Sequence, residues 1–315
     1  MPILNTLPYF TGIVCYVILQ IGDSMEIRVL EYFLAVAEAG SITKAAEHLH
    51  LTQPTLSRQI KELELSLGKE LFIRGSRKIT LTEDGTLLRK RAQEIVDLVN
   101  KTESEVKTKS DDISGDIYIG AAESDSVRII IKCISELQRN YAVRLHIFSG
   151  DAKDTLEKLD NGLIDFALLL GKIDKTKYNS IKLPAEDTWG LLMKKDSPLA
   201  HKKSIMPKDL DGMPLILSRQ SQIEEEIDHW LGAKNIEPNI VATYNLIYNA
   251  SLMVDEGVGY ALTLDKLINN TGSNNLIFTP LNPQLTLQSS IIWKKNQVFS
   301  KMAKVFLTEL KKRIG

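Results

Sequence analysis

One face of a predicted helix over residues 53–67 carries polar side chains that can hydrogen-bond base edges or phosphates. These side chains are Gln53, Thr55, Ser57, Arg58 and Lys61. Apolar residues recur between them at helical spacing and predict a buried opposite face, formed by Leu56, Ile60, Leu63 and Leu67. Amide, hydroxyl and guanidinium groups in the first half of a helix are typical of a helix that enters the major groove of DNA.

A short basic segment follows this helix. Residues 71–73 and 78–81 predict two strands of a hairpin, with Arg74-Gly75-Ser76-Arg77 at its tip. From Gln53 to Arg91 the chain has nine Lys and Arg against five Asp and Glu, a net charge of +4, whereas the whole chain carries −1. A local excess of positive charge attracts phosphates, and such a hairpin lies against the backbone or minor groove of DNA. A solvated surface without a partner is the alternative on charge alone.

Two further helices are predicted before the polar one. Apolar residues at positions 27, 30, 33, 34 and 37 form one helical stripe, Gly40 ends it, and Ser41 can cap a second helix over 42–49. Thr52 can cap the third helix, with Pro54 in its first turn. Three helices and a hairpin predict a winged helix-turn-helix; a small helical bundle whose polar residues face water is the alternative.

Residues 86–109 lack Pro and Gly and predict one long helix. Its positions 88, 92, 95, 99, 102 and 106 step by four and three residues, the rhythm of a two-helix seam, although Thr102 weakens it. We therefore expect residues 86–110 to pair with a second copy of the chain; a partner within the same chain is the alternative. The polar residues 111–115 are the predicted hinge.

Beyond Asp116 the pattern changes to short strands alternating with helices. Strands are predicted over 117–120, 143–148 and 166–170, and helices over 127–141 and 155–161. A second set runs through 189–193, 215–217, 246–255 and 260–262, and 289–294 with a helix over 300–313 closes the chain. This alternation predicts parallel sheets in two lobes, one of residues 116–186 and 287–315 and the other of 187–286.

Ligands of parallel sheets bind beyond the carboxyl ends of the strands, next to helix amino-termini. The candidate residues at these places are Ser124, Asp125, Ser126, Gly150, Asp151, Gly171, Ser218, Gln220, Asn245, Asn249 and Thr263. Each alone is also an ordinary cap or turn residue. A carboxylate at Asp125 disfavours an anionic ligand unless a cation intervenes, and the polar set Asn245, Tyr248 and Asn249 suits an uncharged or zwitterionic one.

Residues 25–85 resemble the winged helix-turn-helix of the LysR-type transcriptional regulators. The matching stretches are FLAVAE (33–38), GSITKAA (40–46), LHLTQPTLSRQI (49–60), LE (63–64), LG (67–68), LFIR (71–74) and LTEDG (81–85). Ile42 and Thr52 depart mildly from the family pattern. By position, the resemblance implies DNA contacts from Thr43, Gln53, Pro54, Thr55, Ser57, Arg58, Arg74 and Arg77.

The remainder of the chain is similar to the periplasmic-binding-protein-like effector domain of the same family. Its clearest marks are GLIDFA (162–167) and GVGYAL (257–262). The resemblance implies an α/β protein with an all-α winged helix-turn-helix head, a long linker helix and a two-lobed α/β effector domain. It further implies a regulator in the cytoplasm that binds double-stranded DNA and a small-molecule effector, forms dimers that pair into tetramers, and contacts RNA polymerase.

Composition and motifs disfavour the rival classes. There is no GxSxG, no glycine-lysine phosphate loop and no His pair at metal spacing, because His48 and His50 diverge around a helix. We therefore expect neither an enzyme nor a bound cofactor or metal. Cys15 and Cys133 lie far apart and suit a reducing compartment. A solute-binding module without DNA binding is the second rival, and the basic residues of the third helix and hairpin argue against it.

Residues 1–24 contain no Lys or Arg, and their apolar run over 10–21 is too short to span a membrane. We interpret them as an upstream extension before Met25, without function; a weak membrane anchor is the alternative.

Overall fold

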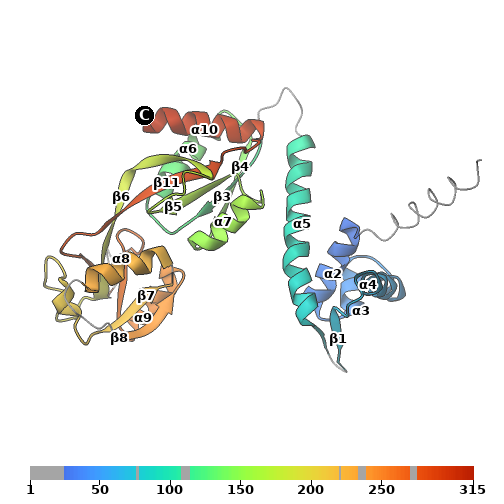
Figure 1. Cartoon of the computed structure of the whole chain (residues 1–315), viewed down its shortest axis with the longest axis horizontal. Coiled ribbons are helices and arrows are strands. Elements are labelled where there is room, and N and C mark those ends of the chain that lie inside the picture. The colour runs from blue at the N-terminus through green and yellow to red at the C-terminus, as the bar shows by residue number, and fades with distance from the viewer. Residues whose placement is uncertain (1–24, 76–77, 108–113, 220, 233–238, 270–274) are drawn as a thin grey trace, which may run out of the picture. The chain divides into compact units, whose positions relative to one another are not determined.

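The computed structural model describes residues 25–75, 78–107, 114–219, 221–232, 239–269 and 275–315. The chain packs into two units, Met1–Glu103 and Ser104–Gly315 (Figure 1). The extension 1–24, Arg77, the hinge residues 111–113 and Gln220 lie outside the described residues. The predictions made for them therefore stay predictions.

Residues 25–75 and 78–82 of the amino-terminal unit fold into three helices and a two-stranded hairpin, followed by α5 (Glu83–Lys107). They are α2 (Ile27–Ala39), α3 (Ile42–His48), α4 (Gln53–Leu67), β1 (Phe72–Arg74) and β2 (Ile79–Leu81). Standard capping interactions begin and end these helices. Gly40 takes a left-handed φ of 59° after α2, and the Ser41 hydroxyl accepts a hydrogen bond from the Lys44 N–H. Thr52 caps α4 in the same way through the Thr55 N–H.

Buried apolar side chains of all three helices form one core, with Phe33, Leu56 and Ile60 at most 1% exposed. The hairpin is fixed to this core by backbone contacts. Glu64 Oε1 on α4 accepts from the N–H groups of Leu71 and Phe72, at 2.8 and 3.2 Å. Ile79 N–H donates to the carbonyl oxygen of Gly40 at 3.0 Å. Helix α4 and the hairpin therefore hold a defined relation to each other.

Helix α5 (Glu83–Lys107) divides its apolar residues between two roles. Ala92 and Val96 are buried in the helix-turn-helix core, and Leu88 packs against it. The predicted seam through positions 88 and 92 is therefore wrong at its amino-terminal end, because the chain's own core takes those residues. The apolar residues of α5 that stay exposed are Ile95 and Val106, which belong to the predicted seam, and Leu87 and Leu98, which do not.

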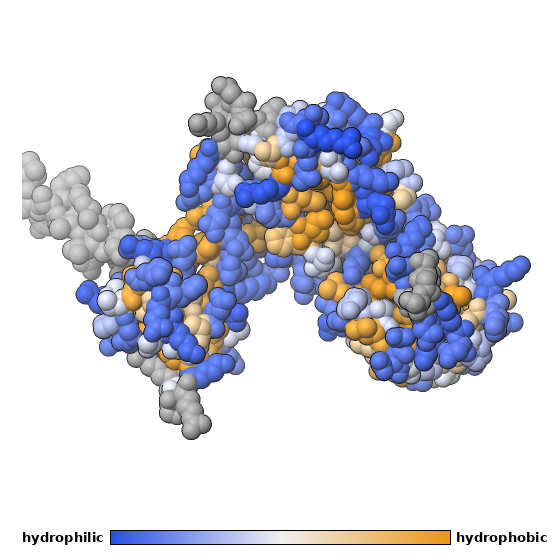
Figure 2. All heavy atoms as spheres, turned by 180° about the vertical axis from the view of Figure 1, so that it is seen from behind, coloured by the Kyte–Doolittle hydropathy of each residue, from blue (hydrophilic) through white to orange (hydrophobic). Residues whose placement is uncertain are grey.

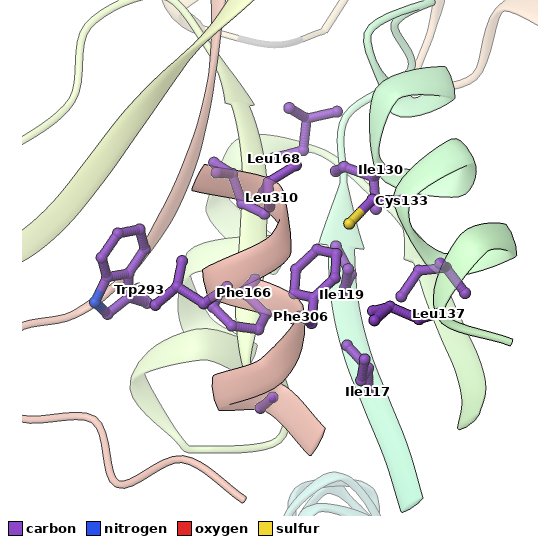
Figure 3. Packing of buried hydrophobic residues seen from close by; sticks show 14 of the residues in the cluster. Ile117, Ile119, Ile130, Cys133, Leu137, Phe166, Leu168, Trp293, Phe306 and Leu310 are labelled. Carbon is purple, nitrogen blue, oxygen red and sulfur yellow. The ribbon is translucent and has the colours of Figure 1, made fainter. Parts of the chain in front are cut away.

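Lobe 1 of the second unit is a sheet covered by helices on both faces. Its elements are β3 (Gly115–Ala121), α6 (Val127–Leu137), β4 (Val143–Ser149), α7 (Ala152–Asp160), β5 (Phe166–Leu170) and, from the chain's end, α10 (Lys301–Ile314). Figure 3 shows α6 and α10 packed on one face, where Cys133 and Phe306 meet Ile119 of β3. Leu159 of α7 packs on the other face.

Lobe 2 repeats this plan. Its elements are η1 (Pro207–Leu210), β7 (Pro214–Ser218), α8 (Ser221–Gly232), β8 (Asn239–Tyr244), α9 (Ile247–Asp255), β9 (Tyr260–Leu264) and β10 (Leu276–Pro280). Trp230 of α8 belongs to the core on one face of the sheet. Ile247, Ala250 and Val254 of α9 belong to the core on the other.

Two long strands, β6 (Tyr178–Lys194) and β11 (Thr286–Lys294), connect the lobes (Figure 1). The strand order β4-β3-β5-β11-β6-β9-β7-β8 runs through both lobes, and β10 pairs with β6. The register of β11 on β6 shifts between Gln288 and Ser290, so Ser289 faces a bulge that contains Pro184. Proline is tolerated at such an irregularity because it has no N–H to donate.

The sheets are mixed, so the prediction of parallel sheets is only partly correct. Strands β3, β4 and β5 are parallel, as are β7, β8 and β9, but β6, β10 and β11 pair antiparallel. Helix α8, strands β8 and β10 and the first half of β6 were not predicted from the sequence. These segments lack a strong period: β8, for example, has exposed Ile240 and Val241 on an edge.

Asp116, at the start of β3, is held by two side chains of the neighbouring strand β4. Arg144 Nε and Nη2 donate to its two carboxylate oxygens at 2.7 and 3.0 Å, and His146 Nε2 lies 2.9 Å from Oδ1. Burial by itself raises the pKa of Asp116, but the hydrogen bonds from Arg144 and His146 outweigh burial and lower the pKa below its usual value.

Replacing Asp116 with asparagine is expected to lower the free energy of unfolding at neutral pH by about 1 kcal/mol. A depressed folded-state pKa means that the carboxylate stabilises the fold above its unfolded pKa of about 3.9 and that this contribution is lost as the pH falls through the folded pKa. The difference between wild type and Asp116→Asn in urea unfolding should therefore shrink in acid. A difference that is the same at neutral and acidic pH would contradict this account.

Candidate DNA-binding and effector sites

The first half of α4 presents its polar side chains to solvent. Gln53, Pro54, Thr55 and Arg58 are exposed, and Ser57 is half-buried, while Leu56 is fully buried between them. The Arg58 side chain is 80% exposed and its Nε donates to Glu62 Oε1 at 2.7 Å. The Glu62 carboxylate raises the pKa of Arg58 through this hydrogen bond. The guanidinium is therefore charged and accessible, and only a surface ion pair competes for it.

The other predicted DNA contacts lie on α3 and the hairpin. Thr43 is exposed in the first turn of α3. Arg74 ends β1, opposite Ile79 of β2, but its side chain and all of Arg77 lie outside the described residues. The assignment of DNA contacts to individual residues stays a prediction.

A small cavity lies at the junction of the two lobes. Its lining includes three of the residues predicted from sequence, Ser218, Asn245 and Thr263. Ser218 follows the pattern expected for the carboxyl end of a strand, as the last residue of β7, and Asn245 follows β8 directly. The lining also includes residues that sequence reasoning missed: Glu123, Leu170, Trp189, Tyr244, Ile247, Leu264 and Leu267. The free volume is about 20 Å³, room for about one water molecule.

Glu123 joins the two lobes across this cavity. It follows β3 of lobe 1, and its Oε2 accepts a hydrogen bond of 2.6 Å from the backbone N–H of Ile247, the first residue of α9 in lobe 2. The first N–H groups of a helix lack partners within the helix and attract anions. Helix α9 has no side-chain cap of its own from Leu246, so Glu123 supplies the anion. Burial raises the pKa of Glu123, and the Ile247 hydrogen bond opposes that rise.

One buried polar atom of the cavity lining, Nε1 of Trp189, has no hydrogen-bond partner among the described residues. The Trp189 side chain is 2% exposed, as is that of Thr263, whose hydroxyl lies beside the Tyr244 hydroxyl. The neighbouring Tyr244 is satisfied, because its hydroxyl donates to the carbonyl oxygen of Leu262 at 2.8 Å. Burial raises the pKa of Tyr244 and keeps this phenol neutral. Unpaired buried polar atoms are rare in folded proteins and mark places where a further partner belongs.

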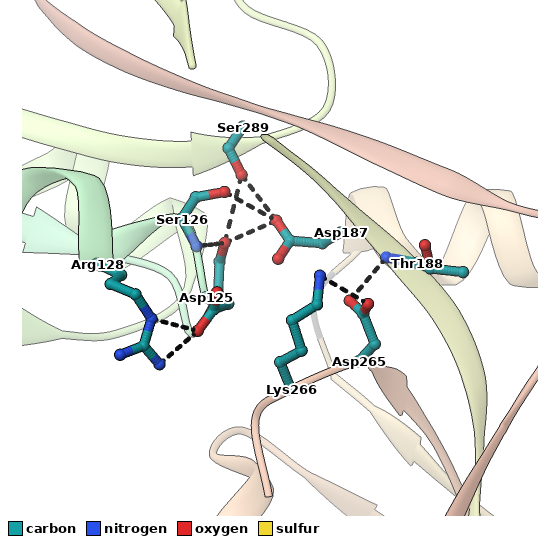
Figure 4. Close-up of polar contacts among 9 residues, drawn as sticks. Asp125, Ser126, Arg128, Asp187, Thr188, Asp265, Lys266 and Ser289 are labelled. Atoms are coloured by element: carbon teal, nitrogen blue, oxygen red, sulfur yellow. Dashed lines mark hydrogen bonds and ion pairs between the residues drawn. The ribbon is translucent and has the colours of Figure 1, made fainter. Parts of the chain in front are cut away.

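Ser124 and Ser126 are both buried and turn towards an internal carboxylate. Figure 4 shows hydroxyl groups of lobe 1 and β11 around Asp187 of β6. Asp187 Oδ2 accepts from Ser124 at 2.6 Å, from Ser289 at 2.8 Å and from Ser126 at 3.4 Å. This cluster fixes the loop after β3 to the two strands that connect the lobes. Neither Ser124 nor Ser126 lines the cavity.

The remaining predicted effector residues have local partners. Asp125 accepts from Arg128 Nη2 at 2.8 Å (Figure 4), and Asp151 caps α7 through the Asp154 N–H at 2.8 Å. Gly150 and Gly171 make backbone hydrogen bonds to Ala121 and Gln288. Asn249 is exposed on α9. The structure therefore does not bring these residues into the cavity, and their role in effector binding stays a prediction.

Other chemistry has little support in the described part of the chain. Burial raises the pKa of the Cys133 thiol to about 11, so the thiol is protonated at neutral pH and packs as an apolar group. Within the described ranges, no group of three or more His, Cys, Asp or Glu could hold a metal ion. A wider groove between α6 and α10 has charged side chains that pair with each other, Arg313 with Glu136 and Lys312 with Glu309. No described helix is long and apolar enough to cross a membrane.

A winged helix-turn-helix followed by a two-lobed α/β domain defines a DNA-binding transcription regulator with a small-molecule domain. Residues 27–86 match the family described as bacterial regulatory helix-turn-helix proteins of the lysR family, and residues 110–315 match the LysR substrate binding domain. The chain belongs to the LysR family of transcription regulators, which are not enzymes.

Individual relatives agree with this assignment. The chain is 27% identical over 279 residues to the Hca operon transcriptional activator HcaR of Escherichia coli strain K12, covering 87% of this chain and 93% of that protein. It is similar in fold to CbnR, a LysR family transcriptional regulator, with a TM-score of 0.75, 20% identity and coverage of 92% of this chain and all of that one. Full-length CbnR complexed with its target DNA gives a TM-score of 0.72 at 21% identity, covering 91% and 99% of the two chains.

Proposed function

We propose that this regulator binds its operator as a homodimer, through α4 and the hairpin, and that a small molecule bound at the lobe junction changes this binding. The main support for the DNA contact is the exposed polar start of α4, from Gln53 to Arg58, whose opposite side packs into the core through the fully buried Leu56. A structure of CbnR with its target DNA supports the same use of this unit. Because DNA is its target, we place the protein in the cytoplasm.

The proposal of a dimer rests on exposed apolar residues of α5. Leu87 is 61% exposed, Val106 is 78% exposed, and Ile95 and Leu98 are each about 40% exposed along the same helix. Figure 2 shows apolar side chains between polar ones on the surface of the molecule. A second copy of α5 offers the matching stripe, and a symmetric dimer presents two copies of α4 to two half-sites. Pairing of dimers into tetramers and contact with RNA polymerase stay predictions from the family resemblance.

The proposed function is tested by binding of the full-length protein to the DNA upstream of its own gene. We expect sequence-selective binding in a gel-shift assay, with affinity falling as salt rises because the protein displaces counterions from phosphates. An unrelated DNA of the same length serves as the control. Absence of binding at low salt would remove the regulator function and leave a solute-binding protein.

A further inference from the structure

The cavity at the lobe junction has an unusual charge for a site that takes a small metabolite. Among its described lining residues Glu123 carries the only formal charge, and no Lys, Arg or His lines it. A ligand with a single negative charge would therefore place a second anion beside Glu123 without a cation to pair with it. Buried charges are stable only when they are paired, so the lining disfavours a simple anion.

The contact between Glu123 and Ile247 shows what kind of group each partner accepts. The amino-terminus of α9 already holds a carboxylate, at 2.6 Å, and so it can bind another one. The Glu123 carboxylate, if it leaves that amide, needs a cationic or other strong donor in the same partly buried place. A molecule that carries both an ammonium and a carboxylate group satisfies both partners at once. A simple amine satisfies Glu123 but leaves the α9 amide unpaired.

The unpaired atom of the lining, Trp189 Nε1, is a second, independent sign of a ligand. An indole N–H can only donate, so it calls for an acceptor. The Trp189 side chain is 98% buried, so bulk water does not satisfy it in this arrangement. A carboxylate near the start of α9 brings acceptor oxygens to the same cavity. The lining residues Leu170, Leu264 and Leu267 are apolar and would suit an uncharged ligand side chain, but the cavity must widen before it can hold one.

The free volume of about 20 Å³ means that a ligand enters only when the lobes move apart. Glu123 and Ile247 come from different lobes, so their hydrogen bond holds the cavity closed without ligand. We propose that the effector is a small zwitterion of the α-amino-acid type. This inference rests on the proposed function of the lobe junction as the effector site. The ammonium group of the zwitterion pairs with Glu123, and its carboxylate takes the place of Glu123 at the amino-terminus of α9.

The test uses the full-length protein and three matched sets of probes. The first set is L-alanine, L-serine, L-valine, L-leucine and L-phenylalanine; the second is their methyl esters, which keep only the ammonium; the third is their N-acetyl derivatives, which keep only the carboxylate. Ligand binding to the folded state raises the apparent melting temperature in proportion to the logarithm of ligand concentration. Titration calorimetry on any probe that shifts it gives the Kd.

We expect at least one free amino acid to bind, and its ester and N-acetyl derivative to bind about tenfold or more weakly. Glu123→Gln should lose about tenfold or more in affinity for the amino acid, because glutamine keeps an oxygen for Ile247 but has no charge for the ammonium. Glu38→Gln makes the same chemical change at an exposed residue of the amino-terminal unit, outside the cavity lining, and should bind as wild type. Far-ultraviolet circular dichroism establishes that each variant is folded.

Three results would overturn the proposal: an N-acetyl derivative that binds as tightly as its free amino acid, unchanged affinity in Glu123→Gln, or no shift from any free amino acid. The operator gel shift on the same preparations separates this failure from failure of the proposed function. Operator binding without any response to amino acids means that the ligand class is wrong. Loss of operator binding in the wild type means that the regulator function is wrong, whatever the probes do.

Discussion

Replacing Arg58 with alanine is expected to weaken operator binding about tenfold to hundredfold, which is the value of a good bidentate contact to a base. The side chain is 80% exposed and pairs with Glu62, one turn further along α4. Exposed ion pairs of this kind contribute little to stability, so the thermal midpoint should stay near that of the wild type. Gel shifts on the operator, and on operators with single base changes, measure the loss and its sequence dependence.

Glu62→Gln is the matched control for Arg58→Ala. It removes the same ion pair but leaves the guanidinium in place, so operator binding should be unchanged or tighter, since a negative charge near the DNA is also lost. Equal weakening by the two variants would show that the ion pair, and not the contact of Arg58 with DNA, matters. A large loss of folding in Arg58→Ala would equally contradict the assigned role.

The double substitution Ile95→Glu, Leu98→Glu is expected to dissociate the dimer and to weaken operator binding about a hundredfold or more. Each side chain is about 40% exposed in the single chain, so the charges are tolerated by the monomer but not by an apolar seam. A monomer loses the gain from binding two half-sites at once, which is on the order of 10² to 10⁴ in affinity. Light scattering coupled to size-exclusion chromatography measures the mass, and gel shifts measure the affinity.

Val298→Glu provides the control for this pair of substitutions. Val298 is 89% exposed in the carboxyl-terminal unit, away from α5 in sequence, so the same apolar-to-acidic change there should leave the dimer intact. A dimer that persists in the Ile95→Glu, Leu98→Glu protein would show that another surface joins the copies. Exposed Ile147 and Phe148 on the edge strand β4 would then be the next residues to change.

The helix-turn-helix could be predicted almost residue by residue because its signals are local. Ser41 and Thr52 cap the helices that follow them, and Gly40 ends the one before, all through contacts a few residues apart. The buried face of α4 followed from the period of Leu56, Ile60 and Leu63, but Leu67, predicted to be buried with them, is 38% exposed in the last turn of the helix. The predicted seam on α5 is wrong at Leu88 and Ala92, which pack in a core that only the folded unit assembles, whereas Ile95 and Val106 of the same seam are exposed.

The lobe junction could be predicted only in part. Ser218, Asn245 and Thr263 follow or end strands, so the rule for parallel sheets located them. Glu123 lies one residue before Ser124 and obeys the same rule, but its partner Ile247 is 124 residues away. Trp189 lies in the long strand β6 and looks like any core aromatic until its unpaired nitrogen is seen. Ser124 looked like a ligand contact because nothing in the sequence pairs it with Asp187.

The bulge of β6 opposite Ser289 lies in the pair of long strands that connects the two lobes. Gln288 Nε2 donates to the carbonyl oxygen of Leu183 at 2.8 Å, so the irregular stretch is satisfied from a side chain and not from the strand ladder. A bulge leaves a residue outside the regular ladder and bends the strand that carries it. We expect the cleft to open by a rotation about this point, at an energetic cost that lowers the affinity for the effector. Residues far from the effector, such as Pro184, would then change the affinity for the effector by changing the cost of this rotation.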